Sequence, residues 1–233
     1  LLNIRGADIA RNPVMHGFVV LHGSGNVDLF ADPAKVGQLK PHLGSTVTLH
    51  APEALLDYVQ TLAGPVRLDK ATVPVAIADV IANRVTWGDD PCALPKACKN
   101  AAEVAGSAAA HLRDGAALVE LLAWLDQQPT GTVTETQVVS RLEDFRSRDN
   151  ALQDISFETI AGTGPNGAIM HYRVTKDTDS VLEDGQLLVL DSGGQYLDGT
   201  TDITRTIAIG SALPEAKQAF TRVLLGMIAM SRL

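Results

Sequence analysis

Two aspartates, Asp191 and Asp202, are the residues of this chain whose type and spacing most directly indicate chemistry. They lie eleven positions apart in the segment LLVLDSGGQYLDGTTDITRT, residues 187–206. Carboxylates are hard oxygen ligands, and a pair held close together suits one or two divalent metal ions, with one carboxylate able to bridge both. The pair is therefore a candidate metal site.

The segment around the two acids has the pattern of a β-hairpin. An apolar run, residues 187–190, ends on Asp191, a Gly/Gln/Tyr stretch turns the chain, and a Thr-rich run carries Asp202 back. This spacing is enough for two short strands and their turn, so we expect the two carboxylates to face each other across the ladder. Like charges placed opposite each other are destabilising, which favours a cation between them.

An ordinary turn is the alternative interpretation of the same residues. Asp and Gly are common in turns, and Asp198 followed by Gly199 is an ordinary turn signal. That interpretation does not explain Asp191, which directly follows an apolar strand, or Asp202, which leads the β-branched run 203–209. Strand interiors are poor places for an Asp that has no partner. The residue types alone leave both interpretations open.

A family resemblance covers the hairpin and reaches the rest of the chain. DSGGQYLDGTTDITRT closely resembles the metal-binding hairpin of the aminopeptidase P family, the Xaa-Pro aminopeptidases of the pita-bread metallopeptidase and creatinase superfamily. ISFETIAGTGPNGAIMHYRV resembles the family's segment with a substrate-contacting histidine, which falls on His171. Similarity in KNAAEVAGSAAAHLRDGAALVELLAWL and LLNIRGADIARNPV is weaker. The resemblance implies that Asp191 binds one metal ion, that Asp202 bridges two, and that the catalytic residue His171 hydrogen-bonds the substrate and helps stabilise the transition state.

The resemblance also implies a cofactor of two divalent metal ions. It favours Mn²⁺, and Co²⁺ or Zn²⁺ would also suit carboxylate and imidazole ligands. The family uses one His and two Glu as further ligands, all downstream of this hairpin, and the sequence ends at Leu233 before any of them. We therefore expect residues 1–233 alone to bind metal weakly and to hydrolyse no peptide.

The function that the resemblance implies is hydrolysis of an N-terminal Xaa-Pro peptide bond by a metal-activated water, with peptides that carry proline in the second position as substrates. One alternative is another superfamily member, a dipeptidase or a creatinase-like hydrolase. Creatinase works without metal, so the presence of both Asp191 and Asp202 argues against it. The other alternative is a nonenzymatic pita-bread binding module, and such modules have typically lost the acids. A downstream His and two Glu would favour the metallopeptidase.

The composition excludes several classes of partner. The net charge is −8 and no stripe of Lys or Arg occurs, which disfavours nucleic acid and anionic membranes. The sequence has no apolar run of about eighteen residues and no N-terminal signal-peptide pattern. Cys92 and Cys98, the only cysteines, do not have zinc spacing, and we interpret them as free thiols of a cytoplasmic protein. The resemblance and the apolar termini favour a homodimer.

We predict an α/β domain followed by an α+β domain. Strand-like and helix-like runs alternate over residues 1 to about 85, and TWGDDPCALP breaks both patterns as a linker does. By the resemblance, residues 1–88 are part of a noncatalytic creatinase-like domain, residues 89–97 a linker, and residues 98–233 the first half of a pita-bread catalytic domain. The chain starts in an apolar run without a Met and stops inside a helical pattern, so we expect it to be part of a longer polypeptide.

Two helices and two strands are expected before the hairpin. We predict a long helix over residues 100–128 and a second one that starts at Thr134, which forms a capping box with Gln137. Arg and Glu side chains of the second helix, among them Arg146, are expected to form a solvated face. ISFETIAG and AIMHYRV are predicted as strands, the second of which contains His171.

Overall fold

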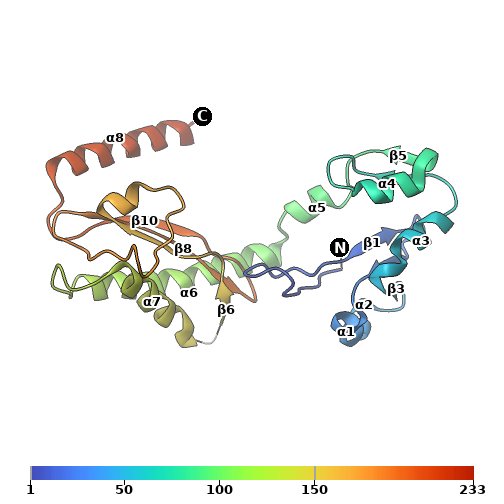
Figure 1. Cartoon of the computed structure of the whole chain (residues 1–233), viewed down its shortest axis with the longest axis horizontal. Coiled ribbons are helices and arrows are strands. Elements are labelled where there is room, and N and C mark those ends of the chain that lie inside the picture. The colour runs from blue at the N-terminus through green and yellow to red at the C-terminus, as the bar shows by residue number, and fades with distance from the viewer. Residues whose placement is uncertain (1, 150) are drawn as a thin grey trace. The chain divides into compact units, whose positions relative to one another are not determined.

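The computed structural model describes residues 2–149 and 151–233. The chain divides into two compact units, an N-terminal unit, Leu1–Lys99, and a C-terminal unit, Asn100–Leu233 (Figure 1). Each unit has its own hydrophobic core. The predicted linker, residues 89–97, includes a short helix, α5 (Ala93–Ala97), and the domain boundaries stay a prediction.

The N-terminal unit alternates short strands with short helices. Its strands are β1 (Phe18–Leu21), β2 (Val27–Phe30), β3 (Val47–His50), β4 (Val66–Leu68) and β5 (Val85–Trp87). Its helices are α1 (Pro33–Val36), η1 (Gly37–Leu39), α2 (Lys40–Leu43), η2 (Pro52–Ala54), α3 (Leu55–Thr61), α4 (Val75–Ile81) and η3 (Ala82–Arg84), followed by α5. β1 and β2 are antiparallel, β2 and β3 are parallel, and β4 and β5 form a separate parallel pair. Side chains of α3 and α4 pack with Phe30 of β2 in one core cluster.

A buried carboxylate, that of Asp28 on β2, gathers three polar side chains in this unit. Nε2 of His22 and Nε2 of His50 each lie 2.6 Å from one of its oxygens, and the Tyr58 hydroxyl donates to Oδ2 at 2.5 Å. Burial alone would raise the pKa of Asp28, but the three hydrogen bonds hold this pKa below its ordinary value. The hydrogen bond to Asp28, assisted by burial, raises the pKa of Tyr58 to about 12.

The stability of the N-terminal unit is expected to depend on pH through this cluster. Because the pKa of Tyr58 is raised from 10.0 to about 12, its contribution is complete below pH 10.0 and is lost as the pH rises through about 12. The contribution of Asp28, whose pKa is lowered, is complete above its ordinary pKa and is lost as the pH falls through the folded-state value. Urea unfolding from neutral to alkaline pH measures the first effect, and Tyr58→Phe should remove part of the alkaline loss. An unchanged alkaline loss in that variant would contradict the prediction.

The C-terminal unit packs two helices on a three-stranded antiparallel sheet. Its helices are α6 (Ala101–Leu125), α7 (Glu135–Arg146), η4 (Ser147–Asp149), η5 (Gly164–Ala168) and α8 (Pro214–Ser231). Its strands are β6 (Leu152–Ile155), β7 (Ile160–Thr163), β8 (Leu187–Ser192), β9 (Gly194–Tyr196) and β10 (Ile203–Ala208). The sheet has the order β10-β8-β7, and β6 and β9 form a separate antiparallel pair. Figure 1 shows α6 and α7 on one side of β8 and β10.

Helices α6 and α7 each begin with a capping box. Asn100 and Glu103 form one at the start of α6, and Thr134 and Gln137 form the other at the start of α7. Each box satisfies backbone N–H groups that the first turn of a helix leaves without partners. The capping box predicted at Thr134 is confirmed.

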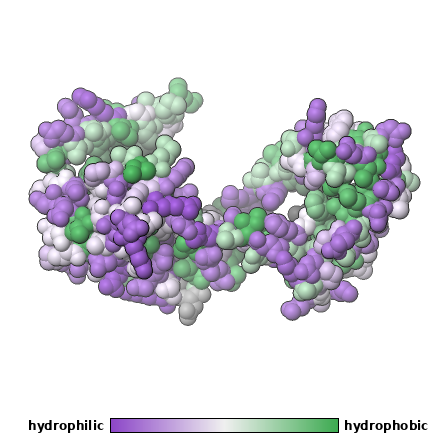
Figure 2. Space-filling model, in the orientation of Figure 1, coloured by the Kyte–Doolittle hydropathy of each residue, from purple (hydrophilic) through white to green (hydrophobic). Residues whose placement is uncertain are grey.

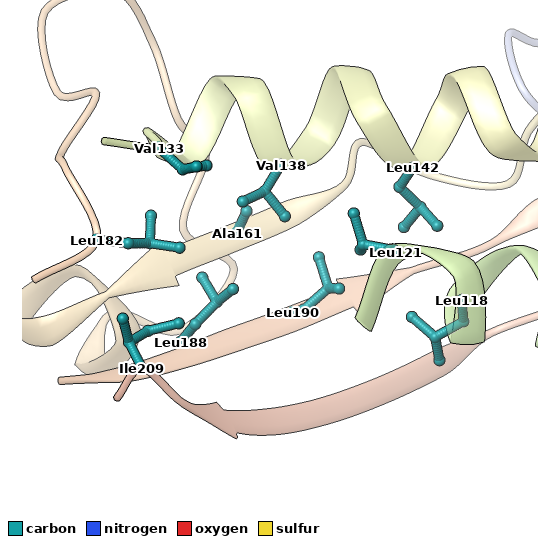
Figure 3. Close-up of a cluster of buried hydrophobic side chains, with 10 residues drawn as sticks. All are labelled: Leu118, Leu121, Val133, Val138, Leu142, Ala161, Leu182, Leu188, Leu190 and Ile209. Atoms are coloured by element: carbon teal, nitrogen blue, oxygen red, sulfur yellow. The ribbon is translucent and has the colours of Figure 1, made fainter. Parts of the chain in front are cut away.

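The core of the C-terminal unit lies between the two helices and one face of the sheet. Leu188 and Leu190 of β8 are buried on that face, because alternate residues of a strand point the same way. They meet Leu121 of α6 and Leu142 of α7 in one cluster (Figure 3). Full burial of each such side chain stabilises the fold by about 1.5–3 kcal/mol. The opposite face of β8, which carries Asp191, is only partly covered, and we call it the open face.

The segment AIMHYRV is not the strand that the sequence predicts. β7 ends at Thr163, η5 begins at Gly164 with Pro165 in its first turn, and His171 lies in a turn that follows. The backbone of His171 has a φ of 53°, in the left-handed region that residues other than glycine rarely adopt. Tyr172 is buried and Met170 is exposed, so the apolar pattern reflects one anchoring side chain in a loop.

Helix α8 carries large apolar side chains on the surface. Phe220, Val223 and Met227 are all more than half exposed, and Figure 2 shows hydrophobic surface over this helix. No helix in the described part of the chain combines the length and the apolar character needed to cross a membrane.

Candidate metal centre

Asp191 and Asp202 lie on the open face of the sheet. In the register of β8 and β10, Asp191 pairs with Thr204. Asp202 directly precedes β10 and stands two residues before Thr204, and continuing the strand alternation by one residue puts it on the same side. The direct partner of Asp191 is therefore Thr204 and not Asp202. The two acids are diagonal neighbours, for which Cα atoms are typically about 7–8 Å apart.

The surroundings leave both carboxylates open to a cation. The Thr204 hydroxyl donates to Oδ1 of Asp191 at 2.8 Å, which orients that carboxylate. Asp191 is half-buried and Asp202 is exposed. Among the residues that the structure describes, no Lys, Arg or His forms an ion pair with either acid. Two hard oxygen donors on one open face fit a divalent ion in donor chemistry.

The described residues supply only part of a ligand set. Within residues 2–149 and 151–233, no group of three or more His, Cys, Asp and Glu side chains has an arrangement that could hold a metal ion. Asp191 and Asp202 are therefore a two-carboxylate portion of a candidate centre. Weak metal binding by residues 1–233 alone stays a prediction.

Two consecutive glycines shape the connection between the acids. Gly194 exchanges hydrogen bonds with Thr201, whose N–H donates to the Gly194 carbonyl and whose hydroxyl accepts from the Gly194 N–H, both at 2.9 Å. The N–H of Ser156 donates to the carbonyl of Gly193, and its hydroxyl donates to the carbonyl of Thr201, both at 3.0 Å. These bonds fix the end of β8 against the residue that precedes Asp202.

Gly193→Ala is expected to destabilise the C-terminal unit by at least about 1–3 kcal/mol, the usual cost of overpacking. A Cβ at this position would lie 1.9 Å from the Thr201 carbonyl oxygen and 2.2 Å from the Ser156 hydroxyl. Gly115→Ala in α6 is the matched control, because its Cβ would meet nothing within 4 Å. Urea unfolding compares the two variants. If Gly193→Ala is as stable as the unsubstituted chain, the close approach is wrong.

The tip of the hairpin packs on α6 through another pair of glycines. A Cβ on Gly106 would lie 2.3 Å from the Asp198 carbonyl oxygen, and a Cβ on Gly199 would lie 3.1 Å from Cβ of Ala110. Arg113 of α6 also forms an ion pair with the Asp198 carboxylate. The Asp198-Gly199 turn therefore has a structural role, distinct from that of the two acids on the open face.

A buried ion pair lies on the core side of β8, the strand that carries Asp191. Nε and Nη2 of Arg146 donate to the two oxygens of Asp114 at 2.7 and 2.9 Å, and Nη2 also donates to the Ser192 hydroxyl at 3.0 Å. The Tyr196 hydroxyl donates to Asp114 at 2.7 Å. Both charged side chains are fully buried. Because Ser192 directly follows Asp191, this buried network fixes the end of β8 that carries the first acid.

The predicted solvated position of Arg146 is wrong. Its guanidinium is buried because a carboxylate on the neighbouring helix offers it two parallel hydrogen bonds. The pattern of the sequence also does not single out Asp114, Ser192 and Tyr196, the other members of this network. One signal was available, since Asp114 lies in the apolar stretch DGAALVELLAWL, and an acid on the buried face of a helix needs a partner.

His171, the third predicted site residue, is exposed and closely follows η5. A Cβ on Gly167 of η5 would lie 3.4 Å from Cγ2 of Val189. Val189 precedes Asp191 by two residues and therefore shares the open face. The structure thus brings Asp191 and Asp202 to one face and places η5, which ends three residues before His171, against Val189 on that face, while the roles of the three residues stay predictions.

Comparisons with known proteins match both units of the chain. The family model described as metallopeptidase family M24 matches residues 96–233. The model described as the creatinase/prolidase N-terminal domain matches residues 1–103.

Curated relatives match over nearly the whole chain. A probable Xaa-Pro aminopeptidase P from Laccaria bicolor is 41% identical over 240 residues, which cover 99% of this chain and 37% of the relative. A protein of the same name from Aspergillus clavatus is 36% identical over 248 residues, with the same two coverages. The chain therefore spans little more than a third of the length of these relatives.

Solved structures show the same fold. An X-prolyl aminopeptidase from Caenorhabditis elegans, a cytosolic enzyme with a di-nuclear active site, superposes with a TM-score of 0.83 at 29% identity, over 92% of this chain and 37% of that one. An Xaa-Pro dipeptidase from Bacillus anthracis has a TM-score of 0.71 at 23% identity, over 94% and 61% of the two chains. These likenesses confirm the predicted α/β and α+β organisation, a creatinase-like domain followed by part of a pita-bread domain. Because the M24 model covers more than half of its residues, the chain belongs to metallopeptidase family M24.

Proposed function

We propose that this chain contributes two metal ligands to an aminopeptidase that hydrolyses the N-terminal Xaa-Pro bond of peptides with proline in the second position. The observation that carries the proposal is the placement of Asp191 and Asp202 on one open face, with Thr204 holding the first. The names of the relatives from Laccaria bicolor and Aspergillus clavatus support the reaction and the substrate. The di-nuclear active site of the enzyme from Caenorhabditis elegans supports two metal ions.

In this proposal Asp191 and Asp202 would hold the metal ions, Asp191 as a ligand of one and Asp202 as a ligand that both could share. Two divalent ions, proposed as Mn²⁺ with Co²⁺ or Zn²⁺ as alternatives, would lower the pKa of a water molecule and polarise the scissile carbonyl. Thr204 keeps one oxygen of Asp191 occupied and so orients the carboxylate. His171 hydrogen-bonds the substrate and stabilises the charge that develops on the carbonyl oxygen.

The proposal extends to location, assembly and domain boundaries. Free cysteines, Cys92 and Cys98, and the cytosolic location of the enzyme from Caenorhabditis elegans support a cytoplasmic protein. The exposed apolar side chains of α8 and the family resemblance support a homodimer. Residues 1–88 form the noncatalytic domain, residues 89–97 the linker and residues 98–233 the catalytic portion.

A chimera tests the proposed reaction. Residues 1–233 replace the matched region of the Laccaria bicolor relative, and release of the first residue from an Xaa-Pro tripeptide is measured with and without Mn²⁺. We expect release that depends on Mn²⁺ from the chimera and no release from residues 1–233 alone. Cleavage of Xaa-Pro dipeptides but not of longer peptides would indicate a dipeptidase instead. Manganese-dependent release by residues 1–233 alone would contradict the proposed division of ligands.

A further inference from the structure

A fully buried carboxylate begins helix α7. Glu135 has no exposed surface, and among the described residues it has no Lys, Arg or His as an ion-pair partner. Its donors are neutral groups: the N–H of Thr163 at 2.7 Å, the side-chain amide of Asn166 at 3.0 Å, the hydroxyl of Tyr172 at 2.9 Å and the N–H of Ser180 at 3.2 Å. A buried acceptor with this many donors is costly to replace, because each donor would be left without a partner.

All four donors come from one continuous stretch, residues 163–180. Asn166 and Tyr172 bracket the turn that contains His171, and Tyr172 is its direct neighbour. The oxygen of the Tyr172 hydroxyl also lies 3.0 Å from the Thr178 carbonyl oxygen, which can accept from it. A single carboxylate on α7 therefore ties down the loop on both sides of His171.

The first part of this stretch, η5, lies over the open face. Gly162 of β7 pairs with Val189 of β8, and a Cβ on Gly162 would lie 2.9 Å from the backbone of Asn166. Gly167 approaches Val189 as described above. η5 is thus folded back onto the strand that carries Asp191, and the turn with His171 follows it directly.

The backbone at His171 is strained. Its φ of 53° lies in the left-handed region, which is unfavourable for a residue with a Cβ. Such a conformation persists only where the surrounding structure imposes it. Here the imposing contact is the buried Tyr172 side chain, whose hydroxyl reaches Glu135.

We infer that Glu135 is a positioning residue, whose buried carboxylate holds the loop of residues 164–180 in the conformation that presents His171 to the face with Asp191 and Asp202. The inference rests on the proposed function for the role of His171. Glu135 is the first residue of α7, and the loop covers its side chain. It would hold His171 in place indirectly, through its hydrogen bonds with Tyr172 and Asn166.

Paramagnetic broadening by Mn²⁺ tests this on the 233-residue chain without an activity assay. The imidazole resonance of His171 is recorded by NMR during titration with Mn²⁺, and His111 on α6 serves as a reference in the same unit. We expect strong broadening of His171 in the unsubstituted chain and its removal by Asp191→Asn. Glu135→Gln is expected to abolish most of this broadening, because the Gln amide N–H₂ would face the N–H and O–H donors that Glu135 accepts from. The affinity of the chain for Mn²⁺ is expected to stay unchanged. Tyr172→Phe, which removes one hydroxyl, is expected to give a partial loss.

The outcomes separate the inference from the proposed function. If Glu135 had only a structural role, Mn²⁺ affinity and His171 broadening would fall together, which would overturn the inference. Equal broadening in the unsubstituted chain and in Glu135→Gln would also overturn it and leave the proposed function standing. The titration is repeated on the chimera, which supplies the proposed downstream ligands, and absence of Mn²⁺ binding at Asp191 there would overturn the proposed function itself. Asp177→Asn, an exposed carboxylate in the same loop, is the matched control and should change nothing. If Glu135→Gln fails to fold, Tyr172→Phe carries the test.

Discussion

Asp202→Asn is expected to lower kcat/KM of the chimera for an Xaa-Pro peptide by about a thousandfold or more. Metal ions contribute several kcal/mol of transition-state stabilisation, and about 1.4 kcal/mol corresponds to a tenfold change in rate. Asn preserves the size of the side chain but carries no charge and only one oxygen donor, so it cannot bridge two ions. The measurement is steady-state hydrolysis at saturating Mn²⁺. Calorimetry on residues 1–233 should show the loss of Mn²⁺ binding in the same variant.

Asp198→Asn is the matched control for this prediction. Asp198 belongs to the same hairpin, but its carboxylate pairs with Arg113 of α6 at the tip. We expect this variant to keep its activity and its affinity for Mn²⁺. Similar losses in both variants would mean that the hairpin as a whole, and not Asp202 as a ligand, is responsible.

Arg146→Met is expected to lower the free energy of unfolding of the C-terminal unit by about 3–5 kcal/mol, the usual cost of removing one partner of a buried ion pair. The substitution leaves the Asp114 carboxylate buried with hydrogen bonds and without its cation. It also removes the guanidinium N–H that donates a hydrogen bond to the Ser192 hydroxyl at the end of β8. Urea unfolding at neutral pH measures the loss.

Two further variants bracket the effect of Arg146→Met. Arg148→Met breaks the exposed pair with Glu120, for which we expect less than about 1 kcal/mol. The double variant Asp114→Leu with Arg146→Met should recover much of the stability, because neither charge of this ion pair is then left buried without its partner. Equal costs for Arg146→Met and Arg148→Met would refute the assignment of Arg146 to a buried network.

Features set by short-range chemistry could be predicted from the sequence. The capping box of Thr134 with Gln137 needs only residues three positions apart, and the structure contains it. The hairpin of β8 and β10 follows from an apolar run, a Gly-rich turn and a β-branched run. The register is less local, because β9 between them pairs with β6, and this places Thr204 opposite Asp191.

Features set by distant partners could not be predicted in this way. Arg146 was expected in solvent because charged residues on a helix usually are, and only the contact with Asp114 on another helix buries it. The apolar pattern around His171 favoured a strand, but hydrogen bonds to Glu135, far upstream, fold the segment into a loop. In both cases the deciding partner is a buried carboxylate, which hydrophobic periodicity does not register.

Adjacent residues of β8 face opposite sides of the sheet, since Asp191 points to the open face and Ser192 accepts a hydrogen bond from the buried Arg146. An ion that binds the native hairpin and not the unfolded chain raises stability by RT ln(1 + [ion]/Kd). Thermal unfolding would therefore report occupancy of the proposed metal centre, and a substitution in the buried network would lower its apparent metal affinity without touching a proposed ligand. Through a single peptide unit, the core and the proposed metal centre would be thermodynamically linked, so sequence drift in one would be constrained by selection on the other.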